Sequence, residues 1–196
     1  MTTKVIQIPS LLVFIALAGC ATVQVTNTAR SSIEQRLLIS SLERAMTALS
    51  TEPLQGKSVA IDFYGLTTDK DFAKEFCTAW LQAKQVRLAA DAREAELHLK
   101  IFAPVLGVDQ GGAFVGVPSV TVPVLGFTTP ELALFKSVTH EGRAAIQIYM
   151  FNDASGQFVD KSPVANGAAS YDEYTILILI HYTRIDMDSQ WQERKG

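Results

Sequence analysis

The chain has 196 residues and a mass of 21.4 kDa, which suits one compact domain. Hydrophobic residues make up 48% and charged residues 19%, which excludes a disordered chain and is enough for a core. The net charge of −3 lacks the basic excess of nucleic-acid-binding proteins. Two cysteines and three histidines offer no disulfide scaffold and no cysteine-based zinc site. We therefore expect no metal, cofactor or nucleic-acid partner.

The first nineteen residues have the pattern of a signal peptide. Lys4 gives a positive start, and an unbroken apolar run follows from Leu11 to Leu17. This run is shorter than the ~20 residues that a helix needs to cross a bilayer, but it matches the apolar region of a secretory signal. An ordinary secretory signal and an uncleaved anchor helix are the alternatives.

A more specific pattern stands at the end of this run. The residues Leu17-Ala18-Gly19-Cys20 resemble the lipobox of bacterial lipoproteins. This resemblance implies a diacylglycerol on the Cys20 sulfur, cleavage before Cys20, and a further acyl chain such as palmitate on the new N-terminus. Membrane lipid would then be a partner, because two or three acyl chains anchor a protein firmly. Ala21, in place of an aspartate, implies the outer membrane, with the protein facing the periplasm.

The rest of the chain divides into a tether, one domain and a tail. Residues 20–30 show no helical or strand periodicity and are expected to form a flexible, lipidated tether. Residues 31–190 contain no repeat and no internal boundary, so we expect a single domain. Residues 191–196 form a polar tail.

Two helices and three strands are expected in the first half of the domain. Ser31 and Glu34 have the spacing of a capping box, and an apolar stripe follows from Ile33 to Leu49. A second helix is expected at 70–84. Its buried face should hold Phe72, Ala73, Phe76, Cys77 and Trp80. Alternating apolar residues predict strands at 57–64, 86–89 and 95–103. A crossover from the first to the second would make that pair parallel.

The second half of the domain is rich in strands. Alternation predicts a strand at 144–151, a turn at 152–156 and a further strand from Phe158. The unbroken apolar run 175–180 is typical of a central strand covered on both faces, which we expect within 174–185. Together these elements predict an α+β fold with a single mixed sheet of about five or six strands and two helices.

One long segment, between Asp109 and Glu131, has no charged residue. Pro118, Pro123 and four glycines argue against a helix and favour an extended hairpin, an edge strand or a loop. Four interpretations stay open: a loop folded back over its own sheet, a surface for self-association or partner binding, a membrane-inserting hairpin of an oligomeric pore, and a glycine-rich ligand loop. The candidate interaction surface consists of Phe114, Val115, Val117, Val120, Val122, Val124, Leu125 and Phe127.

Three further segments are similar to a family of bacterial outer-membrane lipoproteins without an assigned activity. They are Thr26-Asn27-Thr28-Ala29-Arg30-Ser31, Glu131-Leu132-Ala133-Leu134-Phe135, and Tyr171 to Ile176 together with Tyr182 to Asp186. The order helix–strand–helix–strand–strand behind a lipobox also resembles lipoproteins of the curli-secretion-channel and penicillin-binding-protein-activator type. These resemblances imply an outer-membrane lipoprotein and transfer no activity, because a fold does not fix a function.

No catalytic pattern stands out in the sequence. There is no Gly-x-Ser-x-Gly motif and no His-x-x-x-His pair. The histidines, each expected on a surface or sheet face, are His98, His140 and His181. The unpaired Cys77 is expected to be a small core residue. A histidine would become a candidate base or ligand only in a pocket that joins it to acidic residues.

The sequence therefore predicts a non-enzymatic outer-membrane lipoprotein that binds an envelope protein partner or assembles with itself. The charge-free segment is its candidate surface, and the first helix is a lesser one. A subunit of an outer-membrane pore or secretion apparatus is the main alternative. An envelope enzyme or small-ligand binder is a weaker one.

Overall fold

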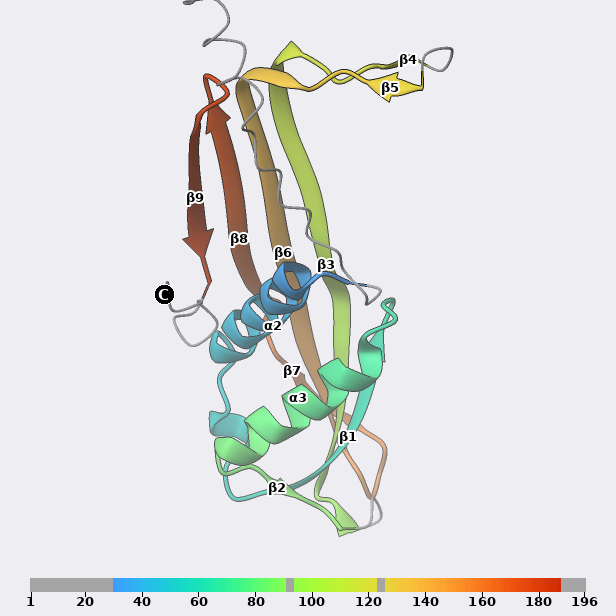
Figure 1. The fold of residues 1–196 in the computed structure, drawn as a ribbon. Helices are drawn as coiled ribbons and strands as arrows, with labels where there is room; N and C mark the ends of the chain where they lie inside the picture. The colour runs from blue at the N-terminus through green and yellow to red at the C-terminus, as the bar shows by residue number, and fades with distance from the viewer. Residues whose placement is uncertain (1–29, 91–93, 123–125, 188–196) are drawn as a thin grey trace, which may run out of the picture. The chain divides into compact units, whose positions relative to one another are not determined.

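The structure, a computed structural model, describes residues 30–90, 94–122 and 126–187 (Figure 1). The described residues from Ser31 onward belong to one compact unit. The expected signal peptide, the tether with Cys20 as far as residue 29, and the tail 191–196 lie outside the described residues.

The described residues form two α-helices, a short 3₁₀ helix and nine strands. In chain order they are α2 (Ser32–Thr47), η1 (Glu52–Leu54), β1 (Ser58–Gly65), α3 (Lys70–Ala83), β2 (Arg87–Leu88), β3 (Leu97–Val117), β4 (Thr121–Val122), β5 (Phe127–Thr128), β6 (Leu132–Asn152), β7 (Phe158–Lys161), β8 (Ala165–Ile176) and β9 (Ile180–Asp186).

Seven of these strands make one mixed sheet. Its order is β2-β1-β3-β6-β8-β9, with β7 paired to β6, while β4 and β5 form a separate two-stranded ribbon. β1 is parallel to both β2 and β3, and the remaining pairs are antiparallel. The predicted α+β fold with a single mixed sheet and two helices is confirmed, as is the parallel pair formed by β1 and β2.

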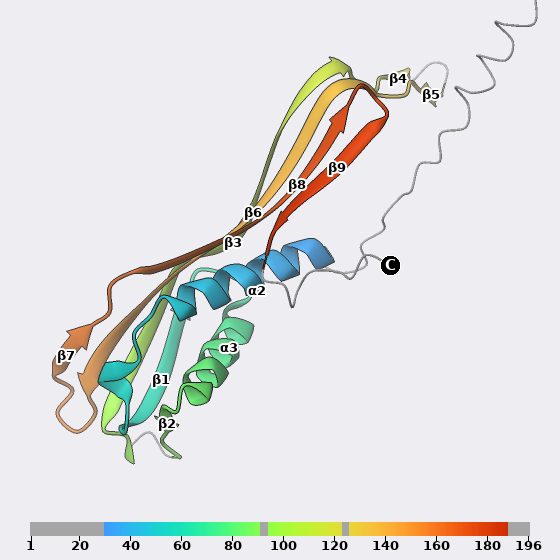
Figure 2. The same ribbon diagram turned by 90° about the vertical axis from the view of Figure 1, so that its left-hand side faces the viewer.

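The sheet is much longer than its helical cover. β3 and β6 have 21 residues each and pair from Leu97↔Asn152 to Val117↔Leu132, whereas β1 pairs with β3 only as far as Ala103. Beyond this point four strands continue past both helices (Figures 1 and 2). We call this part the distal sheet. It comprises 109–117 of β3, 132–141 of β6, 170–176 of β8 and 180–186 of β9.

Helix α2 begins where the sequence predicts. The Ser31 hydroxyl accepts a hydrogen bond from the Glu34 amide (3.2 Å), and the Glu34 carboxylate accepts one from the Ser31 amide (2.8 Å). This capping box satisfies two amides that the first helical turn leaves without partners. The face of α2 that follows is buried by the sheet.

The contact between α2 and the sheet is unusually close. A Cβ atom placed on Gly142 of β6 would lie 2.5 Å from the carbonyl oxygen of Leu37, and one on Gly167 of β8 would lie 2.5 Å from the Ala45 amide nitrogen. The helix backbone therefore rests directly on the strand backbones, and only glycine fits at these two positions. The fully buried Ser41 completes the contact from the helix side.

An arginine then ties α2 to two strands. The Arg44 guanidinium donates hydrogen bonds to the carbonyl of Ala168 (2.6 Å) and to the carboxylate of Asp186 (2.9 Å). This hydrogen bonding is the main reason why the pKa of Asp186 is lowered. β8 and β9 are thereby held against the C-terminal half of the helix.

Helix α3 forms as expected, and most of its predicted buried face is confirmed. The residues that pack against the sheet are Ala73, Cys77 and Leu81, spaced four apart. Phe72 is 54% exposed, so its predicted burial is wrong. Phe76 and Trp80 are partly buried and pack against the core, as predicted. Cys77 is fully buried as predicted, and burial raises the pKa of its thiol to about 12.

Two further expectations about the strands need correction. Residues 110–117 do not fold back over the sheet as a loop; they continue β3 as the edge strand that was one of the expectations for this segment. Residues 175–180 are not part of a central strand: β8 ends at Ile176, β9 begins at Ile180, and the three residues between them form an exposed turn. The apolar composition of that run is therefore not explained by burial.

The close approach of α2 predicts a strong effect of one methyl group. We expect Gly167→Ala to lower the free energy of unfolding by about 2–4 kcal/mol, because the helix must move away from β8. Gly107→Ala is the matched control, since nothing lies within 4 Å of its added Cβ, and it should change stability by less than ~1 kcal/mol. Chemical denaturation of both variants measures this, and equal effects would contradict the close contact.

Candidate functional site

The distal sheet ends in a group of exposed apolar side chains. We call this group the apolar cap. It consists of Val115 and Val117 from β3, Val120, Phe127 from β5, Leu132 and Leu134 from β6, and Leu177, Ile178, Leu179 and Ile180 from the β8–β9 turn. Each of these side chains is between 44% and 84% exposed. An exposed apolar group on a folded domain is a candidate interaction surface.

Two hairpins meet at the cap and are joined by backbone hydrogen bonds. The amide of Leu177 donates to the carbonyl of Leu134 (2.9 Å), and the amide of Ile178 donates to the carbonyl of Ala133 (2.9 Å). Val117 pairs with Leu132 on the neighbouring strands. Segments far apart in the sequence therefore form one end of the sheet, as Figures 1 and 2 show.

The turn that contributes most to the cap has an unusual backbone. Leu177 and Ile178 adopt left-handed conformations, with φ of 50° and 70°. This region favours glycine and asparagine, and it is especially unfavourable for a β-branched residue such as Ile178. Leu179 follows and is 84% exposed. The sequence thus places large apolar residues where both turn chemistry and exposure favour small or polar ones, which points to a function for the tip.

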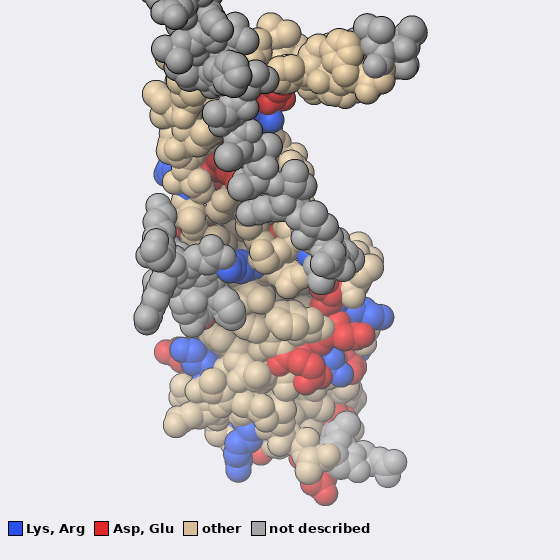
Figure 3. Space-filling model, in the orientation of Figure 1, with Lys and Arg blue, Asp and Glu red and all other residues tan. Residues whose placement is uncertain are grey.

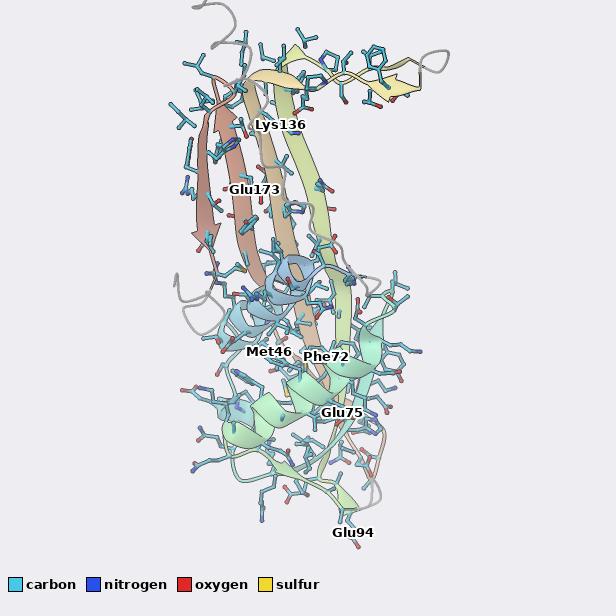
Figure 4. The ribbon with its side chains drawn as sticks, viewed as in Figure 1. Met46, Phe72, Glu75, Glu94, Lys136 and Glu173 are labelled. Atoms are coloured by element: carbon cyan, nitrogen blue, oxygen red, sulfur yellow. The ribbon has the colours of Figure 1, made fainter. Side chains whose placement is uncertain are left out.

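Charged and aromatic residues lie next to the cap: Glu131 directly precedes Leu132 at the distal end of β6, whereas the others lie on the side of the helices. Lys136 and Glu131 form an ion pair (2.8 Å), and Lys136 and Glu173 lie below the strand ends in Figure 4. On the other face of the sheet the Tyr174 and Tyr182 rings stack with centroids 4.6 Å apart. In the face drawn in Figure 3, blue and red side chains gather mainly over the part that carries the helices.

The outer edge of β3 is a second exposed feature. In the described parts of the chain, no strand pairs with β3 on this side after Ala103. From Gln110 to Val117 the edge carries no charged side chain. Long uncharged edges offer unpaired backbone groups to another strand, and proteins usually protect them with charges or a short length.

The structure places the predicted surface residues in two groups. Phe114, Val115 and Val117 lie on β3, whereas Val120 directly precedes β4 and Phe127 lies on β5; all five are exposed. The side chains of Val122, Val124 and Leu125, and the predicted lipid attachment residue Cys20, lie outside the described residues. The prediction missed Leu132, Leu134 and residues 177–180. The only signal for the last group was an apolar run, which sequence patterns assign to a core strand.

The three histidines lie apart in the structure. His140 stands beside the ring of Tyr171, and its Nδ1 atom is buried without a hydrogen-bond partner in the described part of the chain. His181 lies on exposed β9 and its Nδ1 contacts the Thr175 hydroxyl (2.9 Å). Neither is joined to an acidic residue in a described pocket.

His98 is the exception, because it contacts two carboxylates. Its Nε2 lies 2.8 Å from Asp62 and its Nδ1 lies 3.3 Å from Asp153. An open hollow of about 250 Å³ at the edge of β1 is lined by Asp62, His98, Lys74 and Glu75, among others. Each ring nitrogen faces a carboxylate oxygen, so the ring is held in place rather than left free in the hollow. His98 instead links β1, β3 and the turn before β7.

Searches for known relatives and for metal sites add no further assignment. No protein-family model matches the chain, and no curated protein matches it. Within residues 30–90, 94–122 and 126–187, no group of three or more potential metal ligands occurs. No helix in the same described ranges combines the length and apolar character needed to cross a membrane.

The strained turn predicts a stabilising substitution. We expect Ile178→Gly to raise the free energy of unfolding by about 1 kcal/mol, because glycine adopts a positive φ without steric cost. Leu179→Gly is the control: Leu179 is equally part of the tip but has no positive φ, so this change should not stabilise. Thermal unfolding of both variants compares them. A destabilised Ile178→Gly variant would show that the turn is not strained.

Proposed function

We propose that this protein is a lipoprotein of the outer membrane, anchored through acylated Cys20 and facing the periplasm, that binds an envelope protein or further copies of itself. The proposal for the anchor is supported by the lipobox-like Leu17-Ala18-Gly19-Cys20 directly after an apolar run. The proposal for binding is supported chiefly by one observation. The distal sheet extends past both helices and has, in the described residues, a long, uncharged and unpaired edge on β3.

The edge of β3 is suited to strand addition. An incoming strand would find unpaired amides and carbonyls along residues 110–117, where the exposed side chains include alanine, valine and phenylalanine. Main-chain hydrogen bonds would supply affinity, and the alternating side chains would supply specificity. A partner protein and a second copy of this chain can both provide such a strand.

The alternative of a membrane pore subunit is less well supported. A strand that crosses lipid needs one apolar face over ~9–11 residues. In the distal sheet Asp109 and Glu141 face each other on adjacent strands, and Asp172 pairs with Arg184 on the next two. These charges leave too short an apolar stretch above them to line the lipid side of a pore.

An enzymatic function has little to support it. The His98 cluster joins a histidine to acidic residues beside a hollow. Such a group is what an envelope enzyme or a small-ligand binder would require. However, both of its ring nitrogens face carboxylates, one from β1 and one from the turn before β7, which fits a link between these elements. We therefore favour binding over catalysis.

Lipidation at Cys20 is tested by counting thiols. Protein extracted from membranes in detergent and treated with reductant should show no reactive thiol when folded, because Cys77 is buried and burial raises its pKa to about 12. After unfolding it should show one thiol per chain, since the Cys20 sulfur would be a thioether. A Cys77→Ala control should then show none. Two thiols after unfolding would reject the anchor.

Binding through the β3 edge is tested by site-specific photocrosslinking in intact cells. A photoreactive residue at Gly111, which has nothing within 4 Å of an added Cβ, should give one discrete adduct. The matched position is Val159 on β7, which is also exposed and should give none. An adduct of twice the chain mass identifies self-assembly, and one of another discrete mass identifies a partner protein. Adducts from Val159 and none from Gly111 would move binding away from this edge.

A further inference from the structure

The apolar cap lies at the end of the sheet and not on one of its faces. It is formed by the turn of one hairpin, the ends of β3 and β6, and the β4–β5 ribbon, all at one end of the sheet. We propose that the cap inserts into the surface layer of a lipid bilayer and forms a second membrane contact besides the acylated Cys20. The inference rests on the proposed anchor for its biological setting, but its chemistry is that of the cap alone.

The height of the cap fits shallow insertion. Leu132 lies four residue steps from Lys136 on β6, and Leu177, which directly follows β8, lies four steps from Glu173. At ~3.4 Å per residue the apolar part is therefore about 14 Å tall. This is too short to cross a hydrocarbon core of ~30 Å. It is sufficient to bury apolar side chains ~5–10 Å below the headgroups, as membrane-surface segments do.

The residues at the lower boundary of the cap suit the same depth. The Tyr174 and Tyr182 rings stack two residues below Ile176 and Ile180, on the face away from α2. Tyrosine is enriched at membrane interfaces because its ring is apolar and its hydroxyl is polar. On the other face the Lys136 side chain, ion-paired to Glu131, can reach headgroups while its aliphatic part stays with the cap.

The length of chain between Cys20 and the fold allows both contacts at once. Ile33 at the start of α2 and Tyr171 on β8 pack against the same small core cluster. The six residue steps from Tyr171 to Leu177, at ~3.3 Å each, place the tip of the cap about 20 Å further along the sheet. The eleven residue steps from Cys20 to Ser31 span up to ~36 Å when extended. A lipid on Cys20 can therefore lie level with the cap, and the two membrane contacts would reinforce each other.

Lipid insertion also accounts for the strained turn. A positive φ at Ile178 costs free energy that asparagine or glycine would avoid, and Leu179 is 84% exposed. When the tip enters an apolar phase, the free energy of transferring the Ile178 and Leu179 side chains out of water is favourable. This gain offsets the backbone cost at Ile178. The edge of β3 at Gly111 lies below the cap and would stay in water, free for the partner proposed above.

Depth-dependent fluorescence quenching tests the inference. The full lipidated chain carrying Leu179→Trp is reconstituted into phosphatidylethanolamine–phosphatidylglycerol vesicles that contain brominated phospholipids. We expect at least about twofold quenching of the added emission, strongest with bromines near the headgroup end of the acyl chain. The matched control is Phe158→Trp, an exposed aromatic position on β7 at the other end of the sheet, which should not be quenched. The parent chain with Trp80 and Trp191 gives the background.

A second variant distinguishes insertion of the cap into the bilayer from a position of the cap merely near the bilayer surface. Phe127→Asp combined with Leu179→Trp places a charge in the cap at an exposed position, so folding should be retained, as circular dichroism can check. Quenching should fall to the level of the Phe158→Trp control. Unchanged quenching in the charged variant would overturn the inference.

The outcomes distinguish this inference from the proposed anchor. One thiol after unfolding together with no quenching in the Leu179→Trp variant would leave the anchor standing and reject lipid insertion. Two thiols together with quenching in that variant would reject the anchor and support the cap. If the added indole were shielded from aqueous iodide but not quenched by brominated lipid, a protein would cover the cap, and lipid insertion would be rejected.

Discussion

The direct contact between helix α2 and the sheet determines which surfaces this protein exposes. Gly142 and Gly167 let the helix backbone rest on β6 and β8, and Arg44 fixes its far half to Asp186. A helix held so closely covers only the strand residues beneath it, and it cannot slide along the sheet without a clash. The strands continue past it, so the part of the sheet beyond Gly142 on β6 depends mainly on strand pairing for its stability.

The distal sheet consequently combines well-paired backbones with poorly covered side chains. β6 is paired on both sides there, whereas β3 and β9 each have one free edge in the described residues. Four paired strands are enough to hold such a sheet together. However, no layer of the described residues packs on the side chains of the apolar cap at its end. The polar and charged residues of its lower part tolerate water. The apolar cap does not, and this contrast is the reason why we propose different partners for the two parts.

Sequence patterns were sufficient for the half of the fold that obeys local rules. The capping box at Ser31, the helix starting at Lys70, and the alternation at Leu97, Leu99 and Ile101 are each determined by neighbours in the chain, and each is present. The parallel pair of β1 and β2 also followed, because a short helix between two strands leaves little choice. One end of the buried face of α3 did not follow: hydrophobicity alone favours burial of Phe72, but the helix turns Ala73, Cys77 and Leu81 toward the sheet and leaves Phe72 exposed.

The exposed apolar run at 175–180 is the most instructive failure. Patterns assign an unbroken series of leucine and isoleucine to a buried strand because burial normally explains such residues. Here Thr175 and Ile176 end one strand, Ile180 begins the next, and the residues between them form a turn whose backbone favours glycine. Local preference and burial are both violated in the same short turn. Where a sequence departs from both, selection for contact with something outside the chain is the remaining physical reason, and an apolar tip of this height is matched by the surface layer of a membrane better than by water.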